Sequence, residues 1–267
     1  MSTGLGAASA PARTARMLAV ATWLQLKIVA TSAFDGFLNV VWPLFFATTA
    51  FLLYRQSSDP QALVYSGLGA AVMGTWSSIA TSASNLLQNQ RFDGILELLV
   101  ASPTRFPLVI LPMTAALAAT ALYSLVATLL WGKVLFGIDV AVADPVGLVV
   151  ALLVTVLALS IFGLLLTVSM ARFRSGWAIG SMLEYPGWLV CGFLVPVSVL
   201  PDWAQWIARA LPPTWGMDAI RAAATGAPVW GDIGMCAALG CGYAVLAGLL
   251  SEWVLRSARQ HATLALS

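Results

Sequence analysis

The chain has few charged residues for its length. Only 9% of its 267 residues are charged, whereas about a quarter are charged in soluble domains. Hydrophobic residues make up 60%. This balance excludes an ordinary soluble domain and is typical of a protein that lies mostly within a membrane. The net charge of +2 also argues against a nucleic-acid partner, because proteins that bind nucleic acids carry a strongly basic surface.

The residues that most often carry catalysis are equally scarce. The single histidine, His261, lies near the C-terminus. An acid–base or metal site built from several histidines is therefore not available to this chain. The three cysteines form no C-x-x-C pair and lie in or beside apolar runs, where cysteine behaves as a small apolar residue. The G-x-S-x-G motif of serine hydrolases is absent. We therefore expect a protein that is not an enzyme and that holds no metal or cofactor of its own.

Lysine occurs only twice, as Lys27 and Lys133. The phosphate-binding motif of P-loop ATPases needs a glycine-rich loop ending in Gly-Lys, followed by Ser or Thr. Lys133 follows Gly132, but it precedes Val134 and lacks the upstream glycine. The chain therefore cannot hydrolyse ATP as a P-loop enzyme.

Long apolar runs, in contrast, fill most of the chain. A helix needs about 20 mostly apolar residues to cross a bilayer. Six runs reach that length, at about 35–54, 61–88, 106–132, 145–171, 176–200 and 230–255. We predict an all-α membrane protein with six transmembrane helices. The second run would be roughly 40 Å long as a helix, so it must tilt or project beyond a hydrocarbon core of about 30 Å.

The basic residues orient these six spans. With an even number of spans both termini lie on one side, and cytoplasmic loops carry the excess of Lys and Arg. Nine of the 13 basic residues fall on the side of the termini, and four fall on the other side. We expect both termini in the cytoplasm and the chain in the plasma membrane.

The region before the first span divides into a tail and a helix. Residues 1–12 are rich in Ala, Ser and Gly, and we expect a disordered tail rather than a cleaved signal. Residues 13–33 carry basic residues beside apolar ones, which predicts an interfacial helix on the inner leaflet, its cations near lipid head groups. The alternative is an extension of the first span. No repeat or soluble domain is apparent, so residues 13–260 are expected to form one membrane domain.

Residues 201–226, on the predicted outer side, connect the fifth and sixth spans. Trp203 and Trp206 belong to a set of apolar residues at helical spacing, with prolines on either side. A second short helix is expected at about 214–224. Two short helices here favour a partly re-entrant hairpin or an outer gate. The alternative is an aromatic belt at the membrane surface, where tryptophan is enriched.

A short charged segment at 89–102 lies between the second and third spans, on the predicted cytoplasmic side. Asn89 can cap a helix there, and Pro103 ends it. An apolar stripe at helical spacing consists of Phe92, Ile95, Leu96 and Leu99. Asp93 and Glu97 lie one turn apart and repel each other, which a basic partner surface would relieve. The pattern indicates a docking helix, and a solvated loop helix is the alternative.

The stretch from Asn89 to Pro103 resembles the coupling helix of ABC-2-type transporter permeases. The shared pattern is a charged pair, a glycine, a Leu-Glu-Leu-Leu core and a Ser-Pro ending. The stretch 192–203 is similar to the family's fifth-span ending, and Leu211-Pro-Pro-Thr-Trp and Asp218-Ala-Ile-Arg also look familial. With the six-span plan, the resemblance covers nearly the whole chain. The short loops resemble the daunorubicin-resistance and nodulation-type exporters.

This resemblance implies the fold of ABC-2, or type V, exporters. Two permeases, identical or not, would bind two separate ATPase subunits, and ATP with Mg²⁺ would be held by those partners. The docking residues would be Arg91, Phe92, Asp93, Leu96, Glu97 and Leu99. Closure of the ATPases on ATP would rock the spans between inward-facing and outward-facing states. The export of a hydrophobic or amphipathic molecule, such as a drug, lipid or glycolipid, would follow.

Other functions remain open at this point. Export of a polysaccharide or a lipid-linked glycan is the nearest alternative. An ATP-independent channel or secondary transporter is less favoured, because paired broken spans with several acids are not evident. A membrane-embedded enzyme is less favoured, because the sequence shows no cluster of His or Asp residues and no metal-binding cluster.

One acid, Glu184, lies deep in a predicted span. Intramembrane acids are rare and usually face the bundle interior or water. Glu184 is a candidate contact for a substrate or cation, or part of a gate, whereas a structural bond to a neighbouring helix or a protonated acid is the alternative. Aromatic residues such as Trp76 are candidate pathway linings, although most such side chains face lipid or the core. The candidate substrate or gate residues are Glu184, Tyr185, Trp188, Phe193, Trp203 and Trp206.

Overall fold

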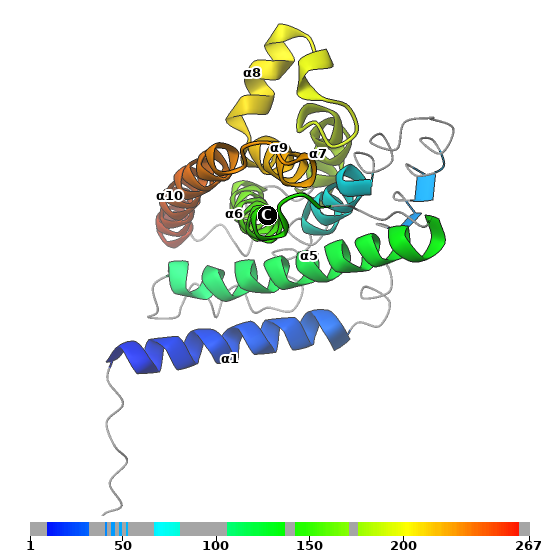
Figure 1. The fold of residues 1–267 in the computed structure, drawn as a ribbon. Helices are drawn as coiled ribbons and strands as arrows, with labels where there is room; N and C mark the ends of the chain where they lie inside the picture. Colours follow the sequence, from blue (N-terminus) through cyan, green and yellow to red (C-terminus); the bar gives the residue numbers. More distant parts are fainter. Residues whose placement is uncertain are drawn as a thin grey trace, which may run out of the picture.

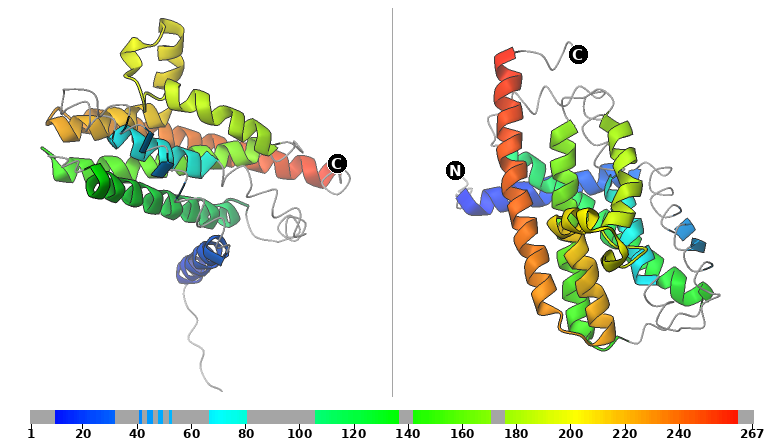
Figure 2. Two further views of the ribbon diagram at one scale, coloured as in Figure 1. Left: turned by 90° about the vertical axis from the view of Figure 1, so that its right-hand side faces the viewer. Right: turned by 90° about the horizontal axis from the view of Figure 1, so that it is seen from above.

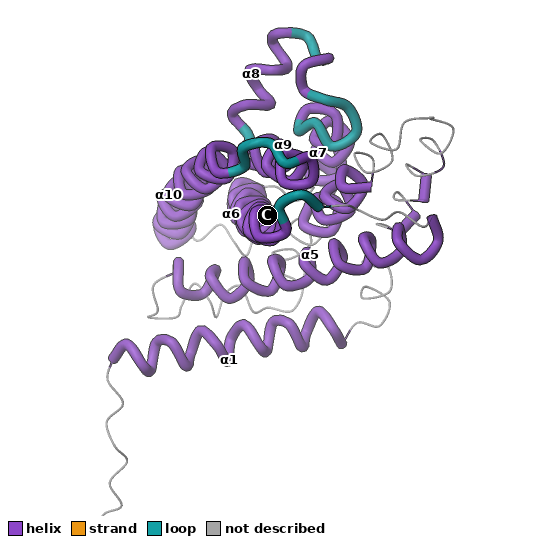
Figure 3. Tube along the Cα trace, viewed as in Figure 1, coloured by secondary structure: helices purple, strands orange, loops and turns teal. Residues whose placement is uncertain are grey.

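Figure 1 shows the computed structural model of the chain, in which every described element is a helix. The description covers residues 10–31, 67–80, 106–136, 142–170 and 176–261, with positions 41, 44, 45, 48, 49 and 52. The α-helices are α1 (Ala10–Thr31), α5 (Phe106–Phe136), α6 (Pro145–Met170), α7 (Gly176–Val190), α8 (Asp202–Ala210), α9 (Pro212–Thr225) and α10 (Trp230–His261). A short 3-10 helix, η1 (Val197–Val199), precedes α8. These ranges contain no strand (Figure 3), so the predicted all-α class is confirmed for them.

Among the described residues, three helices are long and apolar enough to cross a membrane. They are Pro112–Leu135 in α5, Pro145–Ser169 in α6 and Trp230–Trp253 in α10. They correspond to the third, fourth and sixth predicted spans. Of the second span, only residues 67–80 are described, and they are helical and buried throughout. Of the first span, only single positions are described, so the six-span plan as a whole stays a prediction.

The surface of α6 shows that its surroundings are apolar. None of its 26 residues is charged. Val146, Val149, Leu153 and Leu157 recur along the helix and are between 44% and 67% exposed. A helix that faced water would carry polar residues at such positions. No described part of the chain covers this stripe, and such an apolar surface, together with the long apolar helices, is that of a membrane protein.

α6 lies at the centre of the bundle, seen end-on in Figure 1, and contacts α5, α9 and α10. Small residues let the neighbouring helices approach α6 closely. Gly216 of α9 lies against Thr155, and Gly240 of α10 lies against Ala158. Leu159, at the same level of α6, is 0% exposed. α9 and α10 therefore both pack closely on α6.

α1 runs across the direction of α6 and α10 and packs beside α5 (Figure 2). It begins at Ala10 rather than at residue 13, since Pro11 is well accommodated in a first helical turn. The side chains of Arg16 and Lys27 are exposed. Most of the first predicted span lies outside the described residues, so the interfacial helix and the extension of the first span both stay predictions.

The helix of the fifth predicted span, at 176–200, is shorter than predicted and ends at Val190. Gly192 has φ 75°, a left-handed conformation that residues with a side chain disfavour. The N–H of Phe193 donates to the Trp188 carbonyl at 3.2 Å, which is the long hydrogen bond of a Schellman cap. The cap turns the chain away from the helix axis, so the apolar residues that follow form turns.

Two short helices follow, as predicted for 201–226. α8 stands away from the bundle in Figure 1, whereas α9 packs against both α6 and α10. Pro212-Pro213 begins α9, and Gly226, with φ 81°, ends it. The Ala223 carbonyl accepts a 3.0 Å hydrogen bond from the Asp144 N–H. The end of α9 is thereby tied to the start of α6.

Candidate functional site

The predicted docking helix at 89–102 lies outside the residues that the structure describes. This includes all of its candidate residues, namely Arg91, Phe92, Asp93, Leu96, Glu97 and Leu99. The other candidates lie on α7, on the turn after it and on α8, and they are Glu184, Tyr185, Trp188, Phe193, Trp203 and Trp206. Their surroundings separate them into two groups.

Glu184, on α7, is partly buried and faces the helical segment 67–80. Its carboxyl group lies beside the hydroxyl of Ser77. Ser77 is only 4% exposed, and its oxygen has no partner at ordinary hydrogen-bond geometry among the described residues. No basic side chain in the described part of the chain pairs with Glu184. The two groups are therefore neighbours whose bonding capacity is not fully used in this conformation.

Trp76 precedes Ser77 and packs directly on α7. A Cβ added at Gly187, one turn after Glu184, would lie 2.7 Å from Trp76 Cε2 and 3.0 Å from Nε1. Only glycine leaves room for the indole edge at this position. Trp76 is 3% exposed, and within the described ranges its Nε1–H finds no acceptor. We call Glu184, Ser77 and Trp76 the Glu184 cluster.

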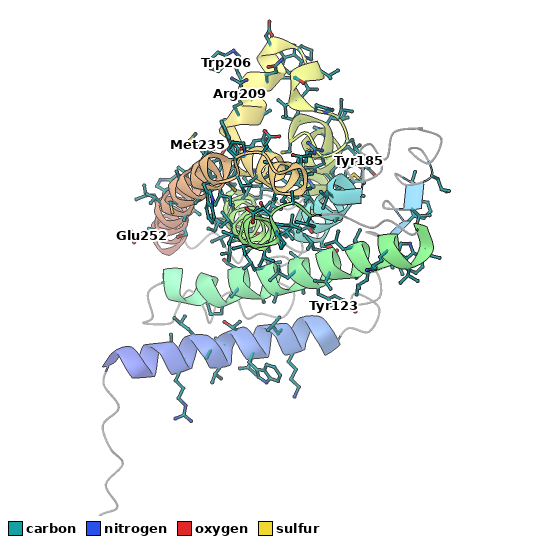
Figure 4. The ribbon with its side chains drawn as sticks, in the orientation of Figure 1. Tyr123, Tyr185, Trp206, Arg209, Met235 and Glu252 are labelled. Carbon is teal, nitrogen blue, oxygen red and sulfur yellow. The ribbon has the colours of Figure 1, made fainter. Side chains whose placement is uncertain are left out.

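Aromatic rings surround this cluster. Trp76 stacks on Phe162 of α6 with ring centroids 5.4 Å apart, and it meets Phe193 edge-on at 6.0 Å. On α7, Tyr185 and Trp188 form an edge-to-face pair with centroids 5.0 Å apart. Trp188 is 8% exposed, whereas Tyr185 is 62% exposed (Figure 4). Trp76 of the cluster is thus packed among aromatic rings, and Tyr185, which follows Glu184 in the chain, reaches the molecular surface.

Phe193 is a core residue in this structure. Its side chain is 0% exposed, and its carbonyl accepts a 3.1 Å hydrogen bond from Arg221 Nη2. Gly69 lies against the same carbonyl, with no space for a Cβ. Phe193 therefore joins the turn after α7 to α9 and to segment 67–80. Its ring does not face an open pathway in this conformation.

Trp203 and Trp206 form a separate exposed surface on α8. They are 68% and 76% exposed, whereas Ala204 and Ala208 are buried on the opposite face of the helix. Figure 4 shows Trp206 and Arg209 at the outer edge of α8, away from α6. In Figure 1, α8 stands apart from segment 67–80, which carries Ser77 and Trp76 of the Glu184 cluster.

Asp218 of α9 lies among other charged residues on the predicted outer side. Partial burial raises the pKa of its carboxyl group, and this is the largest effect. The positive charges of Arg221 and Arg209 lower this pKa, whereas the negative charge of Asp232 raises it. The effect of burial prevails, so the pKa lies above its usual value. Arg221 thus interacts with the Asp218 carboxyl and also donates to the Phe193 carbonyl.

Sequence reasoning missed Ser77 and Gly187. Both lie in apolar runs, where a single serine or glycine is common and carries no signal of its own. Their roles come from the contact between segment 67–80 and α7, which are far apart in the sequence. Glu184 could be found because a charge deep in an apolar run is rare.

Comparison with known proteins identifies the family. The model of the ABC-2 type transporter family matches residues 16–224. No curated protein matches the chain. The matched range takes in α1 and α5 to α9, and also the predicted docking helix at 89–102. Because this match covers well over half of the chain and agrees with its all-helical membrane fold, the protein belongs to the ABC-2 type transporter family.

Proposed function

We propose that the chain is the transmembrane permease subunit of an ABC exporter driven by a separate ATPase. The observation that carries this proposal is the family match over residues 16–224. The chain has no P-loop motif of its own, so the energy for transport has to come from a partner. The permease lies in the plasma membrane with both termini in the cytoplasm, in keeping with its distribution of basic residues.

The proposed contact with the ATPase is the helix at 89–102. Phe92, Leu96 and Leu99 enter a groove of the ATPase, and the acidic residues meet basic side chains there. Asp93 and Glu97 lie one turn apart, so a basic surface removes their mutual repulsion. Closure of the ATPase subunits on ATP pulls this helix and rocks the spans.

A second permease, identical or related, completes the transport pathway. The exposed apolar stripe on α6 is compatible with such a neighbour and equally with lipid, because both are apolar surroundings. The transported molecule is hydrophobic or amphipathic, as in the daunorubicin-resistance and nodulation-type exporters. Aromatic and apolar side chains around α7 suit such a molecule, since they offer few polar contacts.

Copurification tests this proposal. The tagged full chain is coexpressed with candidate P-loop ATPases of its source organism, and ATP hydrolysis is measured after reconstitution in nanodiscs. Glu97→Arg and Asp93→Arg should each release the ATPase and abolish stimulation of its activity by the permease. Asp202→Arg, on the exposed surface of α8, is the matched control and should leave both unchanged. Binding and stimulation that survive both docking variants would refute the docking role.

A further inference from the structure

We infer that the Glu184 cluster is a binding site for the ammonium group of a lipophilic amine. The inference rests on the proposed transport function and narrows its substrate class. Three observations meet in one place: an acid within an apolar helix, two buried polar atoms beside it with unused bonding capacity, and aromatic walls.

The acid requires a partner. A carboxyl group within a membrane span is stable only when it meets a cation, a donor or a proton. The basic side chains of the described ranges do not supply that cation. Ser77 contributes one neighbouring hydroxyl, and a carboxylate has acceptor capacity for several further donors. An ammonium group, with up to three N–H donors, fits this need.

The buried polar atoms point to a ligand and not to a finished structural contact. Ser77 and Trp76 are 4% and 3% exposed, so water does not satisfy them from the surface. Trp76 Nε1 meets no hydrogen-bond partner within the described part of the chain, and Ser77 Oγ has only the neighbouring Glu184 carboxyl, outside ordinary hydrogen-bond geometry. Buried polar groups without partners are rare and costly, and a bound ligand or ion is one explanation for them. An oxygen atom near the amine can accept the Trp76 N–H.

The aromatic rings suit a cation with an apolar body. Trp76 lies against α7 at Gly187, and the Tyr185–Trp188 pair lies on the same helix. Trp76 presents its indole edge to α7 and stacks one face on Phe162, so these rings supply apolar contacts beside the carboxyl group. The apolar body of the ligand can lie along the exposed residues of α7, since Met182 and Leu189 are 74% and 51% exposed. The site therefore combines a charge contact with an apolar approach.

Direct binding to the permease tests the inference. The full chain in nanodiscs is titrated with rhodamine 6G, and fluorescence polarisation is compared with empty nanodiscs. Rhodamine 6G is a lipophilic monocation whose two ethylamino N–H groups stand in for those of an ammonium group. Nile red, a neutral aromatic dye, reports apolar binding alone. We expect saturable binding of rhodamine 6G that Glu184→Gln weakens by about tenfold or more, the value of a lost charge-assisted hydrogen bond. Nile red binding should not change.

Two further variants complete the design. Trp76→Phe keeps an aromatic ring but removes the N–H, and it should weaken rhodamine 6G binding while leaving Nile red unaffected. Glu252→Gln removes an exposed acid on α10 and is the control, which should bind both dyes as the wild type does.

Each contrary result overturns the inference. Wild-type affinity for rhodamine 6G in Glu184→Gln would mean that the carboxylate makes only a structural contact. Equal loss of both dyes at an unchanged melting temperature would mean an apolar site without charge selectivity. If Glu184→Gln does not fold, wild-type affinity in Trp76→Phe decides against the site. Absence of saturable binding to the wild type would also overturn it, while copurification with the ATPase would still stand as an independent test of the transport role.

Discussion

Replacing Gly216 by alanine tests how closely α9 packs on α6. A Cβ at this position would lie 2.7 Å from Thr155 Cγ2 and 2.9 Å from Thr155 Cβ. Carbon atoms do not approach so closely in a packed core, so α9 or Thr155 must move. Thr155 cannot yield easily, because it is β-branched, 1% exposed and held by a 2.6 Å hydrogen bond to the Ala151 carbonyl.

The expected cost of Gly216→Ala follows from two opposing effects. Overpacking of a core costs about 1–3 kcal/mol, whereas alanine stabilises a helix over glycine by up to about 1 kcal/mol. A net loss of about 1–2 kcal/mol corresponds to a fall of roughly 2–8 °C in the melting temperature of a chain of this size. Thermal unfolding in detergent, followed by the fluorescence of the 11 tryptophans, measures it.

A matched variant separates packing from helix propensity. At Gly240 an added Cβ would lie 3.4 Å from the Ala158 Cβ, which is ordinary contact. Gly240→Ala should therefore keep the wild-type melting temperature or raise it slightly. Combining Gly216→Ala with Thr155→Ala should recover part of the loss, because the crowded methyl and hydroxyl groups are gone. If Gly216→Ala melts at or above the wild-type temperature, α9 does not lie against α6 at this distance.

Three further predictions concern polar and aromatic contacts. Arg221→Met removes the hydrogen bond to the Phe193 carbonyl and should lower stability by about 1.5–3 kcal/mol, read as melting temperature; an unchanged value would contradict that bond. Asp218→Asn should raise the melting temperature at pH 7, because burial holds the pKa of this carboxyl above its unfolded value and its charged form is disfavoured in the fold. The gain should shrink as the pH falls below the raised pKa of the wild-type carboxyl, where the protonated aspartic acid is as neutral as asparagine; a gain that is independent of pH would show another cause. Trp188→Ala, at a site 8% exposed, should cost about 3–5 kcal/mol, whereas Trp206→Ala, at a site 76% exposed, should change stability by less than about 0.5 kcal/mol. Equal effects of the two would contradict the exposed position of α8.

The bounds of α6 could be predicted from the sequence, but those of α7 could not. The run that forms α6 begins at Asp144-Pro145, where the Asp144 carboxylate accepts the Gly147 N–H at 2.9 Å and caps the helix. The apolar composition of the run and the capping residue Asp144 therefore predict the same start for α6. Past Val190 the chain stays apolar to Leu200, so composition predicts a longer helix. The left-handed Gly192 ends the helix within that run, and hydropathy does not register backbone conformation.

Of the residues of the Glu184 cluster, only Glu184 could be predicted from the sequence. Glu184 is recognisable as a rare acid in an apolar run. Its neighbours Ser77 and Trp76 come from a segment far away in the chain, and the contact depends on tertiary packing that local pattern does not contain. Phe193 could be singled out as part of a motif, yet its burial against Arg221 and Gly69 could not be. The docking helix at 89–102 stays a prediction, since it lies outside the described residues.

The position of α9 has a consequence for how the chain is made. Its 14 residues form a helix of about 21 Å, too short to cross a hydrocarbon core of about 30 Å. Met217 and Ile220 are 0% exposed in the core that α9 shares with α6 and α10. α10 follows α9 in the chain, so the core that α9 shares with both neighbours can be completed only after residue 253 has been synthesised. During synthesis α9 can therefore contact α6 before α10 exists, and it gains its remaining apolar contacts later.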